Sequence, residues 1–182
     1  MSVLTAPFAT ARGDDLALAD DTATRSWSEL DRRVNQLIDS FRTAGIRPGD
    51  TISVVAGNCN EWFEVAFACS TSGITFVPVN WHFVARELAY IVNDSGSKAL
   101  IASHQFLDVA TKALEEHDCP TVELALVIGA PSSGRFQNFD DFVAAGSPEE
   151  PAGQSFGGPM FYTSGTTGYP KGVRSSLSSM PE

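Results

Sequence analysis

The sequence predicts an α/β fold in which a largely parallel sheet is covered by helices on both faces. Segments with strand and helix patterns alternate from residue 51 to residue 128, the order expected of doubly wound βαβ units with right-handed crossovers. Several expected strands are apolar at nearly every position, as strands are when helices cover both sides of a sheet. At 182 residues, of which 43% are hydrophobic, the chain can bury one sizeable core. Ligands of such folds bind at the carboxyl ends of the strands.

The first long helix is predicted over residues 27–44. Ser26 and Glu29 have the spacing of a capping box, and Gly45 favours a C-terminal stop. The apolar positions of this segment recur at helical spacing: Leu30, Val34, Leu37, Ile38 and Phe41. The helix should therefore bury one face against the sheet.

The other elements follow from the same reasoning. Asn60 is expected to cap the second helix, which ends near Gly73. Strand patterns cover residues 16–19, 24–27, 51–55, 74–79, 99–102 and 122–128, and the first two would form a hairpin. Further helices are predicted over residues 83–92, 104–117 and 139–145. A connection rich in Pro, Gly and Ser follows from residue 146 to residue 158.

Composition excludes several classes of protein. The net charge of -10 argues against a nucleic-acid binder, which needs a basic face. The three cysteines and three histidines have no metal-ligand spacing, so the cysteines are expected to be buried in a reducing compartment. No signal peptide and no transmembrane segment can be identified, which predicts a cytoplasmic protein. The nine acidic residues between positions 101 and 160 are expected to form a solvated surface.

The segment from Phe161 to Val173 carries the chemistry. It follows an expected strand end and combines glycines, hydroxyl side chains and one lysine. Glycine backbone N–H groups can surround an anion, hydroxyls can bind phosphate oxygens or Mg²⁺, and lysine adds a positive charge. The candidate phosphate-binding residues are Thr163, Ser164, Gly165, Thr166, Thr167, Gly168, Pro170, Lys171 and Gly172. We call residues 163–172 the phosphate segment.

Two other interpretations of this segment are weaker. A flexible Gly/Ser/Thr linker has no need of a proline directly before a lysine, which stiffens the chain and directs the lysine. A Walker A loop has the pattern GxxxxGK[ST], but Pro170 precedes the lysine here and Gly172 follows it. An ordinary P-loop NTPase is therefore disfavoured.

The phosphate segment resembles the phosphate-binding motif of the adenylate-forming superfamily, approximately [YF]-T-S-G-[ST]-T-G-x-P-K-G, from Tyr162 to Gly172. Other parts of the chain are also similar to this family. They are the helix start at residues 26–30, the turn at residues 45–50, and the stretch from residue 73 to residue 96, which resembles the acyl-CoA synthetase branch. Trp81 and His82 lie in that stretch, and packing is the simplest role for both.

The resemblance implies a two-step ligase reaction that uses ATP, Mg²⁺ and coenzyme A. A carboxylic acid, expected to be a fatty acid, would form an acyl-adenylate with release of pyrophosphate, and the thiol of coenzyme A would then displace AMP. The resemblance also implies that Thr163 lies near the Mg²⁺ ion and Lys171 beside the phosphates of ATP. Lys171 does not match the family's adenylation lysine, so no catalytic residue is assigned within the chain.

The resemblance also predicts the domain organisation. Residues 1–182 are expected to be a partial N-terminal AMP-binding domain that ends just after the phosphate segment, without the C-terminal domain, and to be inactive alone. The alternative is a standalone nucleotide-binding module or a scaffold that forms a homodimer. Micromolar ATP binding by a compact monomer would favour the standalone module.

Overall fold

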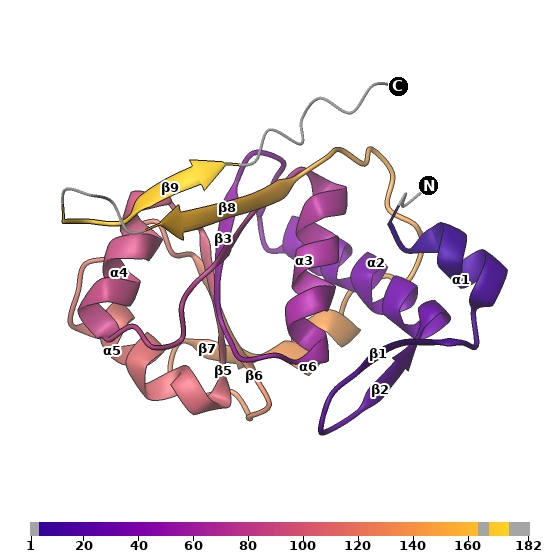
Figure 1. Cartoon of the computed structure of the whole chain (residues 1–182), viewed down its shortest axis with the longest axis horizontal. Helices are drawn as coiled ribbons and strands as arrows, with labels where there is room; N and C mark the ends of the chain where they lie inside the picture. Colours follow the sequence, from indigo (N-terminus) through magenta and orange to yellow (C-terminus); the bar gives the residue numbers. More distant parts are fainter. Residues whose placement is uncertain (1–3, 164–167, 175–182) are drawn as a thin grey trace.

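The computed structural model describes residues 4–163 and 168–174, which form a seven-stranded sheet, a two-stranded sheet and the helices around them (Figure 1). The strands of the large sheet run in the order β7-β6-β5-β3-β4-β8-β9. Their bounds are β3 Thr51–Val55, β4 Thr75–Pro78, β5 Ala99–Ser103, β6 Leu124–Ile128, β7 Phe136–Asn138, β8 Gly158–Thr163 and β9 Lys171–Arg174. Every pairing in this sheet is parallel except that of β8 with β9. The predicted fold class is confirmed.

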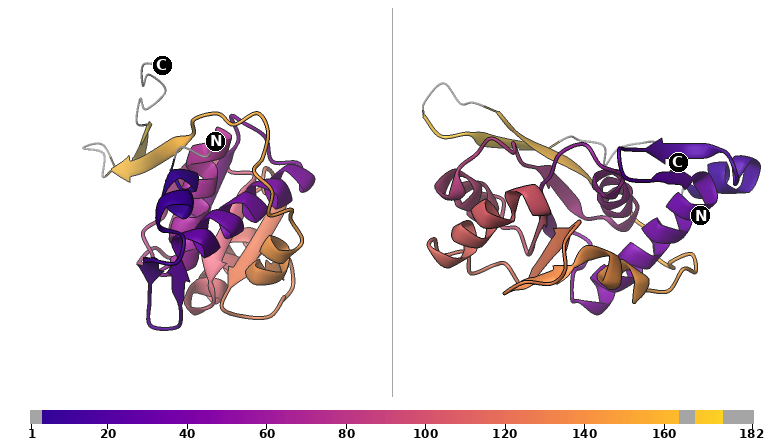
Figure 2. Two further views of the ribbon diagram at one scale, coloured as in Figure 1. Left: turned by 90° about the vertical axis from the view of Figure 1, so that its right-hand side faces the viewer. Right: turned by 90° about the horizontal axis from the view of Figure 1, so that it is seen from below.

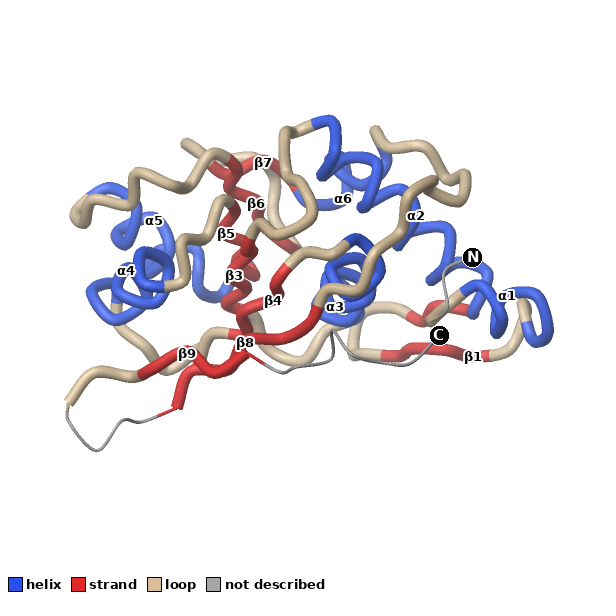
Figure 3. Tube along the Cα trace, turned by 90° about the horizontal axis from the view of Figure 1, so that it is seen from above, coloured by secondary structure: helices blue, strands red, loops and turns tan. Residues whose placement is uncertain are grey.

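Helices cover both faces of the large sheet, as Figure 3 shows with the sheet between them. The helices on one face are α2 Trp27–Thr43, α3 Asn60–Ser72 and α6 Phe139–Ala144, and those on the other are α4 Ala85–Asp94 and α5 Leu107–Glu115. Alternate residues of each central strand serve the two faces. In β5, for example, Ile101 joins the core beneath α2 and α3, whereas Leu100 joins the core beneath α4 and α5. All five residues of β3 are buried, because both its sides are covered.

Helix α2 confirms the predicted capping box. The Glu29 N–H donates to Ser26 Oγ at 3.3 Å, and the Ser26 N–H donates to the Glu29 carboxylate at 2.8 Å. The predicted apolar face is fully buried at Leu30, Val34, Leu37, Ile38 and Phe41. Local sequence therefore determined both the start of this helix and the face that it packs.

The prediction that Asn60 caps α3 is wrong. Cys59 occupies the capping position without a side-chain hydrogen bond, and Asn60 is the first helical residue. The carboxylate of Asp20 accepts the Asn60 N–H at 2.9 Å, while the Asn60 side chain donates to the Ala23 carbonyl at 3.0 Å. Asp20 belongs to the turn between β1 Leu16–Ala19 and β2 Thr24–Ser26, so a residue distant in the sequence caps this helix.

Other element boundaries differ by a few residues. The helix expected from residue 83 begins at Ala85, and the one expected over 104–117 divides into a short 3₁₀ helix, η1 His104–Phe106, followed by α5. The short helix α1 Ala6–Arg12 and strands β7 and β9 were not predicted. Helix α1 has no buried residue, and it packs on α2 through stacking of Phe8 on Trp27, with ring centroids 4.6 Å apart.

Strands β8 and β9 form a hairpin at the edge of the sheet, and Figure 2 shows it extending beyond the main body. Only the first residues of β8 pair with β4, in the register Thr75 with Gly158 and Phe76 with Pro159. All four residues of β9 are exposed. Among the described residues, no helix has both the length and the apolar character needed to cross a membrane.

Candidate phosphate-binding site

The β8–β9 hairpin brings the two ends of the phosphate segment together. Thr163, the last residue of β8, pairs directly with Lys171, the first residue of β9. Residues that are directly opposite in an antiparallel pair share one face of the sheet, so the Thr163 hydroxyl and the Lys171 stem lie on the same side. The predicted residues Ser164, Gly165, Thr166 and Thr167 lie outside the described residues. Of the remaining candidates, Gly168, Pro170 and Gly172 lie on the return path into β9 and within it.

Two of the predicted glycines have separate physical reasons to be glycine. Gly168 has φ +114°, a left-handed conformation that a side chain would strain. Gly172 lies flat against the neighbouring strand, since a Cβ there would be 3.1 Å from the Met160 sulfur and 3.1 Å from the Tyr162 ring. The glycine at 172 thus allows close packing within the hairpin, a role that the sequence pattern did not indicate.

Helix α4 holds both strands of the hairpin. The Tyr162 hydroxyl, from β8, donates to the Asp94 carboxylate at 2.6 Å. The Tyr90 hydroxyl donates to the Pro170 carbonyl, next to β9, at 3.0 Å, and its ring packs against Tyr169 with centroids 5.1 Å apart. We call Tyr90 and Asp94 the α4 clamp. Its two members lie four residues apart and so on one face of the helix. Both also fall in the stretch from residue 73 to residue 96 that resembles the acyl-CoA synthetase branch, although neither signal indicated a contact with the hairpin.

Strand β9 exposes two positive charges on the hairpin. Lys171 and Arg174 are exposed, and neither forms an ion pair with another described residue. Burial and the hydrogen bond to Asp94 raise the pKa of Tyr162 well above its usual range, so this phenol stays a neutral donor. Lys171 therefore lies at the pair next to the turn and Arg174 at the opposite end of the hairpin, while Asp94 of α4 accepts from Tyr162, one pair away from Lys171.

A groove of about 530 Å³ lies beside the hairpin at the carboxyl ends of β4 and β8. Its lining is mostly apolar: Pro78, Val79, Asn80, Phe83, Ile91, Phe161, Tyr162 and Pro170. Trp81 and His82 follow Asn80, and their rings stack at 3.5 Å. The Trp81 ring also stacks on that of Phe106, with centroids 5.8 Å apart, yet Trp81 remains 49% exposed. Both residues make the packing contacts that were expected of them.

The cysteines and histidines form no metal centre in the part of the chain that the structure describes. Cys69 and Cys119 are buried as expected, and Cys59 is half-buried. Burial raises the pKa of the Cys59 thiol to about 12, so the thiol is not a nucleophile at neutral pH. No thiol chemistry is assigned to these positions.

The doubly wound sheet places the chain in the α/β class, in which ligands bind at the carboxyl ends of parallel strands. Residues 6–180 match the family described as AMP-binding enzyme, and the chain belongs to this family. The resemblance to the N-terminal portion of adenylate-forming enzymes of the acyl-CoA synthetase branch is thereby confirmed, since the relatives are acid ligases.

Among these relatives is the fatty acid–[acyl-carrier-protein] ligase ScoC of Streptomyces coeruleorubidus, 31% identical over 150 residues. That alignment covers 82% of this chain and 28% of the ligase. A feruloyl-CoA synthase from an Amycolatopsis species is 32% identical over 152 residues, covering 81% of this chain and 27% of the synthase. The chain thus spans little more than a quarter of the length of these curated relatives.

Solved structures share the fold. The anthranilate CoA ligase AuaEII in complex with anthranoyl-AMP aligns with a TM-score of 0.86 and 23% identity, over 95% of this chain and 34% of that chain. The inhibitor-bound N-terminal domain of FACL13 from Mycobacterium tuberculosis aligns with a TM-score of 0.82 and 24% identity, over 96% of this chain and 43% of that chain. At these identities the likeness establishes the fold alone.

Proposed function

We propose that the chain is the nucleotide-phosphate-binding part of an acid–thiol ligase. In the proposed reaction, a carboxylate attacks the α-phosphate of ATP to give an acyl-adenylate and pyrophosphate, and coenzyme A then takes the acyl group and releases AMP. The observation that supports this best is the pairing of Thr163 with Lys171, which places a hydroxyl and a cation on one side of the hairpin at the two ends of the phosphate segment.

Each placed residue has a role in the proposal. Lys171 offsets negative charge on the β- and γ-phosphates, and this charge grows as pyrophosphate leaves. Gly168, in its left-handed conformation, presents backbone to the anion where a side chain would obstruct it. Pro170 and the α4 clamp hold the return strand, so that the cation is positioned before ATP arrives. Ser164, Gly165, Thr166 and Thr167 would supply further hydroxyl and N–H donors.

The residues also fit a magnesium ion bound with the nucleotide. Mg²⁺ in nucleotide sites takes most of its ligands from phosphates and water and needs only one or two protein oxygens. Thr163 is exposed at the end of β8 and can provide one such oxygen. When bound, the ion would neutralise phosphate charge, while Thr163 and Lys171 orient the triphosphate from the two strands.

The proposed substrate is a carboxylic acid of low polarity, with a fatty acid as the first candidate. ScoC acts on fatty acids according to its name, whereas the Amycolatopsis enzyme is named for a feruloyl product. The apolar groove beside the hairpin supports a substrate of this kind, since Phe83, Ile91 and Phe161 line it. The relatives extend well beyond the matched region, so we propose that acyl transfer also needs residues outside these 182.

Isothermal titration of MgATP into the chain tests the proposal. We expect saturable binding that Lys171→Ala weakens at least about tenfold, equivalent to about 1.4 kcal/mol. Lys112→Ala on α5 is the matched control, because it removes a lysine away from the hairpin and should leave the affinity unchanged. Equal affinity in the Lys171→Ala variant would contradict the assignment. Carboxylate-dependent release of pyrophosphate by the chain alone would contradict the need for further residues.

A homodimeric scaffold is the second candidate, and strand β9 is the observation that favours it. This strand is an edge with four exposed residues, and such edges can pair with a second copy. Sedimentation equilibrium, combined with the MgATP titration, discriminates the two proposals. A dimer that binds no MgATP would support the scaffold, and a monomer that binds MgATP would support the ligase part.

A further inference from the structure

Strand β9 ends the large sheet and leaves one edge open. It is the last strand in the order β7-β6-β5-β3-β4-β8-β9, and β8 is its only strand partner among the described residues. Figure 2 shows the β8–β9 hairpin extending beyond the main body, so this edge is accessible. The N–H and C=O groups along an open edge are a template on which another extended segment can add as a strand.

One face of the hairpin carries an exposed apolar pair. Phe161 and Val173 are directly opposite in the register, and they are 51% and 55% exposed. On the other face, Met160 is buried in the core beneath α4, and Tyr162 packs against the same core. A strand added beside β9 would cover part of the exposed pair, provided that its residue opposite Val173 is apolar.

Two cations flank Val173 along β9. Lys171 lies two residues earlier and so on the same face of the strand, whereas Arg174 follows directly and lies on the opposite face. Both are exposed, and neither forms an ion pair with another described residue. The edge of β9 therefore presents one positive charge on each of its faces.

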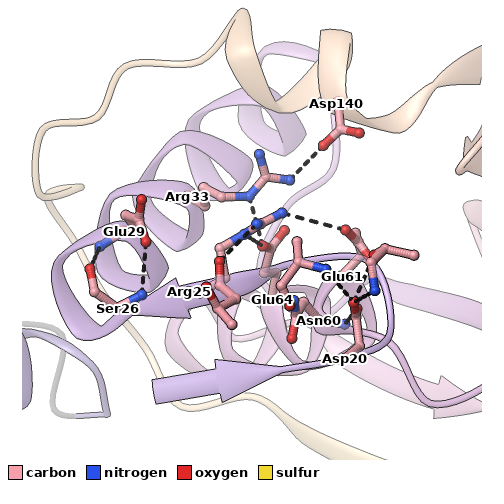
Figure 4. A network of polar contacts seen from close by, with 12 residues as sticks. Asp20, Arg25, Ser26, Glu29, Arg33, Asn60, Glu61, Glu64 and Asp140 are labelled. Carbon is pink, nitrogen blue, oxygen red and sulfur yellow. Dashed lines mark hydrogen bonds and ion pairs between the residues drawn. The ribbon is translucent and has the colours of Figure 1, made fainter. Parts of the chain in front are cut away.

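The arginines near α3 differ from these two cations, because the fold supplies their partners. The guanidinium of Arg25 lies 3.2 Å from the Glu64 carboxylate (Figure 4). That of Arg33 lies 2.7 Å from the same carboxylate and 2.7 Å from the carboxylate of Asp140. Their charges are compensated within the protein, whereas no described carboxylate compensates those of β9.

We propose that the open edge of β9 binds an extended acidic segment of another polypeptide, which adds to the sheet as an antiparallel strand. Residues directly opposite in such a pair share one face, so the register determines which side chains meet. Carboxylates of the partner lie opposite Lys171 and Arg174, and an apolar residue lies opposite Val173. Along the partner strand the pattern is acid, apolar, any residue, acid.

A second copy of this chain fits the edge less well. If two β9 strands paired antiparallel about their centre, Lys171 of each copy would face Arg174 of the other. Like charges directly opposite in a sheet are destabilising, whereas opposite charges stabilise the pair. Charge complementarity therefore favours an acidic partner.

Calorimetry with the peptide acetyl-Thr-Glu-Val-Thr-Glu-Thr-amide tests the proposal on the whole chain. We expect saturable binding, and the analogue with Gln in place of both Glu should bind about tenfold more weakly, because two cross-strand charge pairs are lost. The acidic peptide with a fully N-methylated backbone should not bind, since it keeps both charges but lacks the N–H donors of a strand.

Variants of the chain test the assigned register. Arg174→Gln should weaken binding of the acidic peptide about threefold, as expected for one charge pair, and leave binding of the Gln analogue unchanged. Arg32→Gln, which removes an exposed charge from α2, is the matched control and should leave both affinities unchanged. Arg174 has no role in the proposed phosphate site, so this comparison is independent of the proposed ligase function.

A competition measurement connects the two proposals. Lys171 belongs to both, so a saturating concentration of the acidic peptide should lower the affinity for MgATP, and this expectation rests on the proposed function. Peptide binding that leaves the MgATP affinity unchanged would contradict the acid placed opposite Lys171. If MgATP does not bind at all, the proposed function fails, and the peptide measurements still decide the present inference.

Four results would overturn the proposal. The Gln analogue or the N-methylated peptide binds as tightly as the acidic peptide, the acidic peptide does not bind at millimolar concentration, or Arg174→Gln leaves its affinity unchanged. Sedimentation equilibrium supplies the remaining comparison. A dimer of the chain that excludes the peptide would assign the edge to a second copy.

Discussion

The hydroxyl of Tyr90 donates a hydrogen bond to the carbonyl of Pro170, 3.0 Å away and 80 residues later in the chain. This bond joins α4 to the start of β9, while Asp94 on the same helix accepts from Tyr162 on β8. Only two residues of β8 pair with β4, so the hairpin would otherwise be attached through few contacts. The α4 clamp thereby links the orientation of the phosphate segment to the core of the sheet.

Removing the Tyr90 hydroxyl should weaken nucleotide binding more than it weakens the fold. Tyr90→Phe deletes one hydrogen bond, and we expect a several-fold loss of MgATP affinity with only a small change in the free energy of unfolding. Thr121→Val is the matched control, because it deletes a hydroxyl that donates to the Ser97 carbonyl at 2.9 Å, away from the hairpin. Calorimetry and urea unfolding measure the two effects. A loss of affinity that is equal in both variants would contradict a positioning role for Tyr90.

Gly168→Ala should strain the turn that leads into β9. An alanine at φ +114° costs about 1–3 kcal/mol, because its Cβ collides with the local backbone. We expect weaker MgATP binding and a lower unfolding free energy. Gly158→Ala, at the start of β8, is the control, since a Cβ there meets no atom within 4 Å and φ is not positive. Equal stability of the two variants in urea would show that position 168 tolerates a side chain.

Glu64→Gln should destabilise the protein strongly. The Glu64 carboxylate is fully buried and accepts from both Arg25 and Arg33, so its neutralisation leaves two partly buried cations without their shared partner. Breaking a buried pair costs about 3–5 kcal/mol. Asp108→Asn is the contrasting variant, because its ion pair with Lys112 is exposed and screened by solvent and so contributes little to stability. Urea unfolding of both variants at neutral pH measures the difference, and similar losses would disprove this ranking.

Acid should destabilise the contact between the β1–β2 turn and α3. Hydrogen bonds from Thr22, Asn60 and Ala23 hold the pKa of Asp20 well below its usual range. A lowered folded-state pKa means stability that is present above the unfolded pKa of about 3.9 and lost as pH falls further. We expect Asp20→Asn to be less stable than the parent at pH 7, by about 1 kcal/mol as for other helix caps, and the difference to shrink below pH 4. Unfolding measured at several pH values tests this, and a constant difference would contradict it.

The candidate site could be proposed from the sequence, because glycines, hydroxyls and a lysine in this order are a local pattern. Thr163 and Lys171 do lie at the two ends of a hairpin. Their direct pairing could not be predicted, since strand register depends on contacts with other parts of the chain. The roles of Tyr90 and Asp94 were hidden for the same reason, because their partners are distant in the sequence.

The sequence by itself determined the long helices, the central strands of the sheet and their order, but not α1, β7 or β9. Helix α2 starts at its capping box, and β3, β5 and β6 are recognisable as buried strands, because these signals are carried by neighbouring residues. Tertiary structure alone decided that Asp20 caps α3, that α4 holds the hairpin, and that Thr163 pairs with Lys171. Each of these joins residues from separate elements, so it exists only after the sheet has ordered them in space.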